Sequence, residues 1–287
     1  MRLGNYKKHL RHKNQIAKKT VSLTERGIIL CADDFGLNSG VSRGILKLVQ
    51  LDRLSAVSCM VNMTDFNQSA EALSAIKKKI QIGLHFNLTE GYLLSERDRP
   101  CFSLNELLIK SHLGLINPSL IAKEFNAQLD HFIFMMGRMP DFIDGHQHVH
   151  QFPKIRQVIL SLYEERLRAH EVYIRSTYPA VTLPQFNLKG NILAVTGGKK
   201  LQAELKKLTI SHNPFFSGVY DFSDNSDYRF LFRQWLALLP ADALIMCHPG
   251  EQSTDSDPIA HTREAELNYF LSDEFLKDCR EFRILLK

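Results

Sequence analysis

Two adjacent carboxylates, Asp33 and Asp34, directly follow the apolar run GIILCA at residues 27–32. Such a run is typical of a buried strand, so the two acids are expected where that strand ends. Neighbouring carboxylates repel each other unless a positive group lies between them or one of them holds a proton. The pair alone does not settle its role, because either acid could instead cap the helix that follows, so the rest of the sequence must supply the positive group.

Histidines follow or end three further apolar runs in the same way. His85 lies in the run 80–86, His146 follows DFIDG, and His248 follows ALIMC. An isolated histidine at such a position is commonly a packing residue. However, the C-terminal ends of parallel strands meet at one edge of a sheet, so four such ends favour a shared site.

A carboxylate and two neutral imidazoles form a suitable three-ligand set for a divalent cation and leave positions open for water and substrate. We predict that Asp34, His85 and His146 are these ligands. Asp33 is then free to act as a general base towards metal-bound water. This ligand set suits Zn²⁺ on chemical grounds.

Strand and helix patterns alternate along the chain and must position these residues. The expected strands are 27–34, 55–61, 80–86, 141–145, 172–176, 243–248 and 282–286, with weaker patterns at 191–195 and 217–222. The expected helices are 39–51, 66–79, 117–136, 154–169, 198–210, 227–238 and 262–280. Alternation of this kind predicts parallel strands joined by crossover helices. The number of units favours a single α/β domain with a regular or irregular (β/α)-barrel-like fold over an open doubly wound sheet.

The charge of +5 comes from a basic leader, since residues 1–26 hold eight Lys or Arg and one acid. We expect two parts, a basic N-terminal extension (1–26) and a folded domain (27–287). The leader fits a targeting segment, a weak attraction to anionic lipid or a solvated extension, of which the last is favoured. The slightly acidic body argues against nucleic acid as a partner. No apolar run is long enough for a transmembrane segment.

The five cysteines are scattered and form no C-x-x-C pair, which favours a reducing cytoplasm. Oligomeric state stays open, because the apolar stretch HFIFMM at 131–136 fits either a core or a homo-oligomer interface.

Four motifs in series carry a family resemblance: ADDFG (32–36), GLHFNLTEG (83–91), DGHQHVHQFP (144–153) and CHPG (247–250). Together they resemble the YdjC-type carbohydrate deacetylases, which include chitooligosaccharide deacetylases and proteins associated with hopanoid biosynthesis. The resemblance covers about residues 27–287. It implies metal-assisted hydrolysis of an N-acetyl group on an amino sugar, commonly with Mg²⁺, on a (β/α)-barrel-like fold. Its acid pair corresponds to Asp33 and Asp34, and its ligand histidines correspond to His85 and His146.

Deacetylation also needs a proton donor for the leaving amine. His248 is the predicted general acid, because histidine ordinarily titrates near neutral pH, although a structural histidine in a Pro-Gly turn is the competing interpretation. Arg175, at the end of VYIRS, is expected to orient Asp33 or to hold substrate. His148 and His150 are expected to support the ligands or line the sugar site, since alternate residues of a strand share a face; a polar loop also fits this run.

Two other classes stay open at this point. A glycoside hydrolase uses paired acids that flank the bond at roughly 5–10 Å, which suits adjacent residues poorly. A non-catalytic carbohydrate-binding protein would keep the fold without the metal ligands. The expected substrate is a short oligosaccharide or a glycolipid headgroup.

Overall fold

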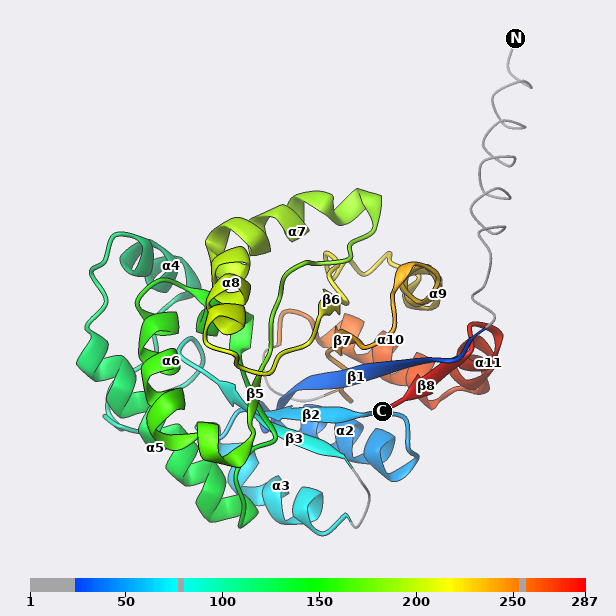
Figure 1. Cartoon of the computed structure of the whole chain (residues 1–287). Coiled ribbons are helices and arrows are strands. Elements are labelled where there is room, and N and C mark those ends of the chain that lie inside the picture. The colour runs from blue at the N-terminus through cyan, green and yellow to red at the C-terminus, as the bar shows by residue number, and fades with distance from the viewer. Residues whose placement is uncertain (1–23, 77–79, 253–256) are drawn as a thin grey trace.

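The computed structural model describes residues 24–76, 80–252 and 257–287. Its strands form one parallel sheet in the order β5-β4-β3-β2-β1-β7-β6, and β8 pairs with the first residues of β1 (Figure 1). The strand bounds are β1 Arg26–Phe35, β2 Ala56–Cys59, β3 Gln81–Phe86, β4 Phe142–Gly145, β5 Tyr173–Ile174, β6 Phe215–Ser217, β7 Ala243–Cys247 and β8 Ile284–Leu286.

The strand order is that of a barrel with a gap. Beyond β1, the next strands are β7 and then β6, whereas an open doubly wound sheet would continue there in ascending order. Among the described residues, no strand ladder joins β5 to β6, and the isolated bridge between Ala180 and Phe216 lies at this opening. The expectation of an irregular (β/α)-barrel-like fold is therefore confirmed.

Helices surround the curled sheet (Figure 1). Their ends follow local signals: Asn38 caps the helix after β1 by accepting from the backbone N–H of Val41, and Gly137 ends the helix before β4 at a φ of 67°. The α-helices are α2 Ser39–Gln50, α3 Thr64–Ser74, α4 Leu104–His112, α5 Pro118–Met136, α6 Ile155–Arg166, α7 Asn187–Leu193, α8 Lys199–Lys207, α9 Tyr228–Leu238, α10 Ala260–Leu271 and α11 Asp273–Glu281. Shorter turns are η1 His146–Gln151, η2 Arg168–His170, η3 Pro184–Phe186 and η4 Ala194–Gly198.

Several expected elements need correction. The weak strand at 191–195 is the end of α7 and the start of η4, and the weak strand at 217–222 overlaps β6 by one residue. The single helix expected at 262–280 is broken at Ser272 into α10 and α11, and α4 was not foreseen. The helix expected at 66–79 ends at Ser74, and residues 77–79 lie outside the described residues.

The core lies on both faces of the curled sheet: helices pack against the outer face, and strand residues that include Cys31, Ala56, Phe142 and Leu244 pack against one another on the inner face. β2 and β4 are buried along their whole length, as is typical of parallel strands. The basic leader lies almost wholly outside the described residues, so the boundary at residue 26 stays a prediction. In the part of the chain that the structure describes, no helix is long and apolar enough to cross a membrane.

Candidate metal centre

The acid pair lies at the C-terminal end of β1, with each side chain almost fully buried. The pairing of β1 with β2 shifts register between Ala32 and Phe35, and Asp34 adopts a φ of 71°. A positive φ is costly for a residue with a Cβ, so the surrounding contacts must hold this backbone in place. The two carboxylates consequently have different sets of partners.

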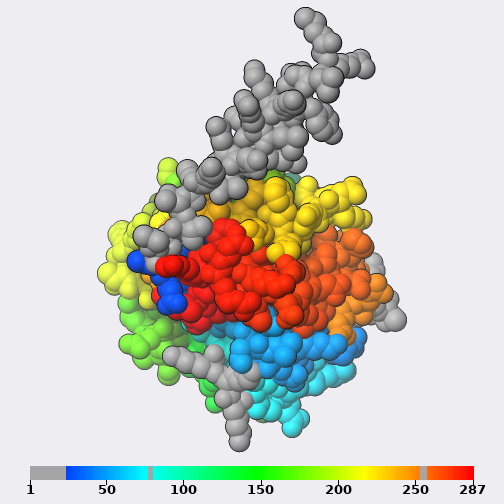
Figure 2. All heavy atoms as spheres, turned by 90° about the vertical axis from the view of Figure 1, so that its right-hand side faces the viewer, coloured from blue at the N-terminus to red at the C-terminus, as the bar shows by residue number. Residues whose placement is uncertain are grey.

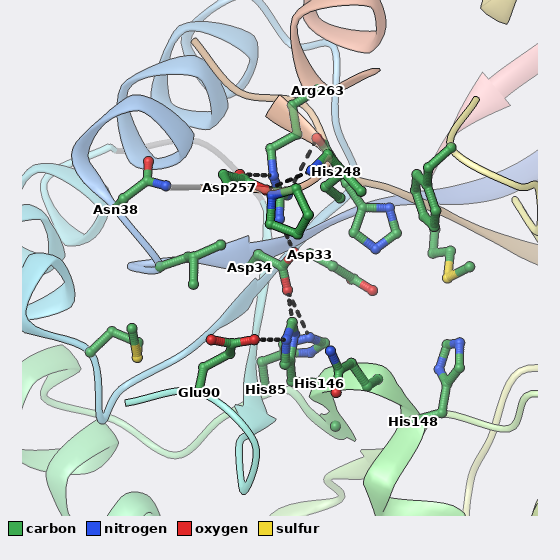
Figure 3. Close-up of a pocket in the computed structure, with 18 residues that line it drawn as sticks. Asp33, Asp34, Asn38, His85, Glu90, His146, His148, His248, Asp257 and Arg263 are labelled. Atoms are coloured by element: carbon green, nitrogen blue, oxygen red, sulfur yellow. Dashed lines mark hydrogen bonds and ion pairs between the residues drawn. The ribbon is translucent and has the colours of Figure 1, made fainter. Parts of the chain in front are cut away.

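Asp34 meets the two predicted ligand histidines. Its Oδ1 lies 2.8 Å from Nδ1 of His146, at the start of η1, and 3.2 Å from Nε2 of His85 on β3 (Figure 3). One donor atom from each residue lies within 4.8 Å of the other two, and all three side chains are buried. The structure thus brings Asp34, His85 and His146 together from three separate segments.

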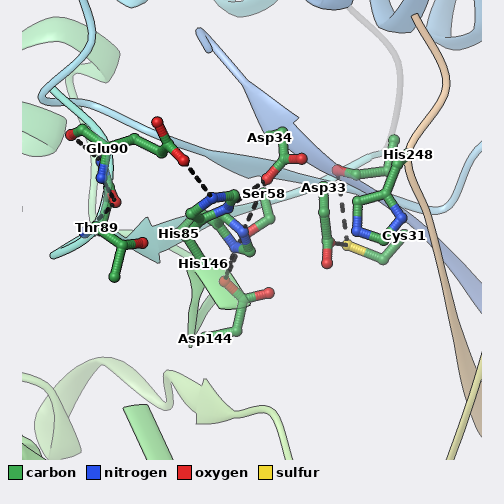
Figure 4. Close-up of polar contacts among 12 residues, drawn as sticks. Cys31, Asp33, Asp34, Ser58, His85, Thr89, Glu90, Asp144, His146 and His248 are labelled. Atoms are coloured by element: carbon green, nitrogen blue, oxygen red, sulfur yellow. Dashed lines mark hydrogen bonds and ion pairs between the residues drawn. The ribbon is translucent and has the colours of Figure 1, made fainter. Parts of the chain in front are cut away.

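Asp144 at the end of β4 fixes the orientation of His85 (Figure 4). Its Oδ1 lies 2.7 Å from Nδ1 of His85 and accepts a hydrogen bond from the hydroxyl of Ser58 at 2.5 Å. Burial acts to lower the pKa of His85, but Asp144 and Asp34 raise it to about 10. The carboxylates around His85 therefore favour positive charge at this ring. A histidine that binds a metal commonly has its second ring nitrogen hydrogen-bonded to a carboxylate, which is the position that Asp144 takes here. The donor set and its charge both fit a divalent cation.

Arg263 on α10 contacts the other oxygen of Asp34, which the sequence patterns did not indicate. Its Nη2 lies 2.8 Å from Oδ2 of Asp34, and its Nε donates to Asp257 at 2.6 Å. Burial would raise the pKa of Asp34, but His146 and Arg263 hold it well below its usual range. Asp34 is therefore ionised, with one oxygen directed to the histidines and the other to Arg263.

Asp33 is held by the fully buried Arg175, which follows β5. The guanidinium donates from Nη1 to Oδ2 at 2.6 Å and from Nη2 to Oδ1 at 2.7 Å, and it also lies 2.6 Å from Oδ2 of Asp144. Arg175 does not line the pocket beside the acids, so the structure places it against Asp33 rather than on a substrate surface. Cys31, Asp33 and Asp144 also form a cluster of metal-binding residue types, but Arg175 occupies its centre.

The expected strand-like histidine run is wrong, because residues 146–151 form the short helix η1. Gln147 and His148 have φ values of 50° and 59° within it, which breaks the alternation. His146 and His148 line the pocket, whereas His150 is buried away from it and donates from Nε2 to the carbonyl of Arg175 at 3.0 Å. Burial lowers the pKa of His150 to about 4.

His248 lies after β7 and lines the same pocket (Figure 3). Its backbone N–H donates to the buried Glu266 at 2.6 Å, and Glu266 also accepts from the hydroxyl of Tyr220 at 2.5 Å. Burial lowers the pKa of His248 to about 4, although Asp34 and Asp33 act to raise it. The expectation that this histidine titrates near neutral pH is therefore not met; it is neutral at pH 7.

The pocket has a volume of about 520 Å³. Its polar side holds both acids, Asp257, Arg263 and Glu90, whose carboxylate lies 3.9 Å from Nε2 of His146. Six apolar residues also line the pocket: Leu37, Met63, Phe222, Met246, Pro258 and Ile259. A few directed polar groups beside apolar walls are typical of a small-molecule site.

These features define a parallel α/β barrel-like protein with a buried carboxylate–dihistidine cluster that opens into a pocket. The sequence pattern of the family described as YdjC-like protein matches residues 27–281. The chain belongs to this family.

Two proteins with similar sequences are both named chitooligosaccharide deacetylase. The chain is 33% identical over 146 residues to the chitooligosaccharide deacetylase of Yersinia enterocolitica (serotype O:8 / biotype 1B), which covers 50% of this chain and 57% of the relative. It is 33% identical over 157 residues to the enzyme of the same name from Yersinia pestis (strain Pestoides F), which covers 52% and 62%. The match therefore spans less than two thirds of these relatives.

A solved structure supports the fold. A protein of Enterococcus faecalis V583, whose name refers to cellobiose-phosphate cleavage, superposes with a TM-score of 0.72 at 20% identity. The superposition covers 92% of this chain and 97% of that one.

Proposed function

We propose that residues 27–287 form a divalent-metal-dependent deacetylase that removes the N-acetyl group from an amino sugar. The observation that carries this proposal is the meeting of Asp34, His85 and His146 in one pocket with a second, separately held acid, Asp33. The deacetylase names of the Yersinia relatives support the same reaction.

Asp34, His85 and His146 would hold the metal. Bound there, a divalent cation would supply Lewis acidity for activating water and for stabilising negative charge on an amide carbonyl oxygen. The nitrogen-rich donor set suits Zn²⁺, whereas the family resemblance favours Mg²⁺, so the choice between them is part of the test.

Asp33 is the proposed general base. Arg175 donates a hydrogen bond to each oxygen of Asp33 and so holds this carboxylate at the pocket wall. There the carboxylate would accept a proton from the attacking water. The water oxygen bonds to the acetyl carbon, and the C–N bond then breaks with the electron pair going to nitrogen.

His248 is the proposed proton donor to that nitrogen. Because its imidazole is neutral at pH 7, it must first receive the proton that Asp33 has taken from water. The nitrogen then leaves as an amine and the acetyl group as acetic acid, which releases its remaining proton to solvent and becomes acetate. No net proton is consumed by the side chains.

The proposed substrate is a short N-acetylated oligosaccharide or a glycolipid headgroup. The apolar wall, which includes Phe222 and Met246, suits the C–H face of a sugar ring, and the acids opposite suit its hydroxyl groups.

The test is a panel of N-acetylated sugars incubated with metal-free protein and with added Mg²⁺ or Zn²⁺. Acetate release that requires metal and leaves the glycosidic bond intact supports the proposal. New reducing ends without acetate would show a glycoside hydrolase instead. Sugar binding with neither product would show a non-catalytic carbohydrate-binding protein.

A further inference from the structure

The insertion between β5 and β6 carries an unpartnered apolar face. Leu188, Ile192 and Val195 on α7 and η4 are 73%, 49% and 78% exposed. Their spacing of four and three residues places them on one side of a helix. Figure 1 shows α7 on the outside of the domain, beyond α8. We call these three residues the α7 face.

The chain segment that carries the α7 face contains basic but no acidic residues. No Asp or Glu occurs between Glu171 and Glu204, while Lys189, Lys199 and Lys200 are exposed within this stretch. Lys200 lies 3.8 Å from Glu204 at its far end. Exposed aliphatic side chains bordered by lysines, without acids, match the pattern of helices that lie in the headgroup region of anionic membranes.

We propose that the α7 face docks onto the surface of an anionic lipid bilayer. Leu188, Ile192 and Val195 enter the boundary between headgroups and acyl chains, and the lysines contact lipid phosphates. A second copy of the chain is a poorer occupant, because a two-fold interface across this face would bring lysines against lysines with no acid of the same stretch to pair with them.

The segment that carries the α7 face is hydrogen-bonded to η1, part of which lines the pocket. The side-chain amide of Gln151, at the end of η1, donates to the carbonyl of Leu193 at 3.1 Å and to the hydroxyl of Thr196 at 2.9 Å. Gly197 has a φ of 143°, and a Cβ there would lie 2.0 Å from the carbonyl oxygen of Gln151. Because η1 also carries His146 and His148, a bilayer on the α7 face would lie against a segment connected directly to the site.

The test is co-sedimentation of the full chain with phosphatidylcholine vesicles, with and without phosphatidylglycerol. We expect binding to the anionic vesicles and a partition coefficient about tenfold lower, or more, for Leu188→Ser/Val195→Ser. Lys189→Glu/Lys199→Glu should lower it similarly without touching an apolar side chain. Phe134→Ser, at an 80% exposed position on α5, is the matched control and should bind like the wild type.

All variants keep residues 1–26, so any contribution of the eight basic residues of this leader is the same in every measurement. The proposal is overturned if the wild type does not bind, or if both double variants bind as well as the wild type does. It is also overturned if light scattering shows a wild-type dimer that Leu188→Ser/Val195→Ser converts to a monomer, because the face would then join two copies. None of these results depends on the deacetylase activity.

Discussion

The guanidinium of Arg263 lies 2.8 Å from one oxygen of Asp34, while His85 and His146 both contact the other oxygen. This division prevents rotation of the carboxylate and leaves a single oxygen directed to the two imidazoles. We therefore expect Asp34 to bind a metal through one oxygen. Arg263 would act as a positioning residue, through Asp34 and without contact to the metal.

Arg263→Ala should weaken metal binding by about 10- to 100-fold, the usual effect of removing a group that orients a ligand. Calorimetric titration of metal-free protein measures this, and Arg263→Lys should recover part of the affinity. Asp257→Asn is the control, because it removes the charge of a second partner of Arg263 and keeps the contact between Arg263 and Asp34. Unchanged affinity in Arg263→Ala would contradict the positioning role.

Asp33→Asn should keep the metal and lose about 10²- to 10⁴-fold in turnover, because an amide cannot act as a general base. Asp34→Asn, His85→Ala and His146→Ala should instead lose metal, measured as bound metal per chain after dialysis. If Asp33→Asn lost the metal while Asp34→Asn retained it, the roles of the two acids would be exchanged.

Arg175→Met should lower the free energy of unfolding by about 3–5 kcal/mol, because it leaves two buried carboxylates, Asp33 and Asp144, without their cation. Urea unfolding measures the change. Arg138→Met removes a partly exposed pair with Asp141 and should cost less than about 1 kcal/mol. Equal losses in the two variants would show that Arg175 does not hold buried charge in place.

His150 should make the fold sensitive to acid. Its pKa is about 4 in the folded protein and about 6.5 when unfolded, so the unfolded chain binds more protons between these values. Stability is therefore lost as pH falls through this window. From pH 7 to pH 5, the wild type should lose about 2 kcal/mol more than His150→Gln, whose amide retains a donor for the Arg175 carbonyl. An equal loss of unfolding free energy in the wild type and in His150→Gln would contradict this.

The predictable part of the molecule is the part with strong local patterns. Apolar runs between turn residues indicate most of the strands, and the rule that parallel strand ends converge is enough to predict that Asp34, His85 and His146 lie together. Sequence patterns did not identify Arg263, because an arginine in a helix is ordinarily exposed and its contact with Asp34 joins residues 229 positions apart. The separation of His150 from His148 also depends on positive φ values that no histidine spacing indicates.

β1 carries both acids and pairs with three strands: β2, β7 and β8. Protection of amide hydrogens follows the free energy of local opening, and opening β1 requires breaking all three ladders. Its amides should therefore be among the slowest to exchange with deuterium. Asp33 and Asp34 therefore lie on a strand that rarely opens, with or without a bound metal or substrate. The positions of the two carboxylates are set by the folded chain itself.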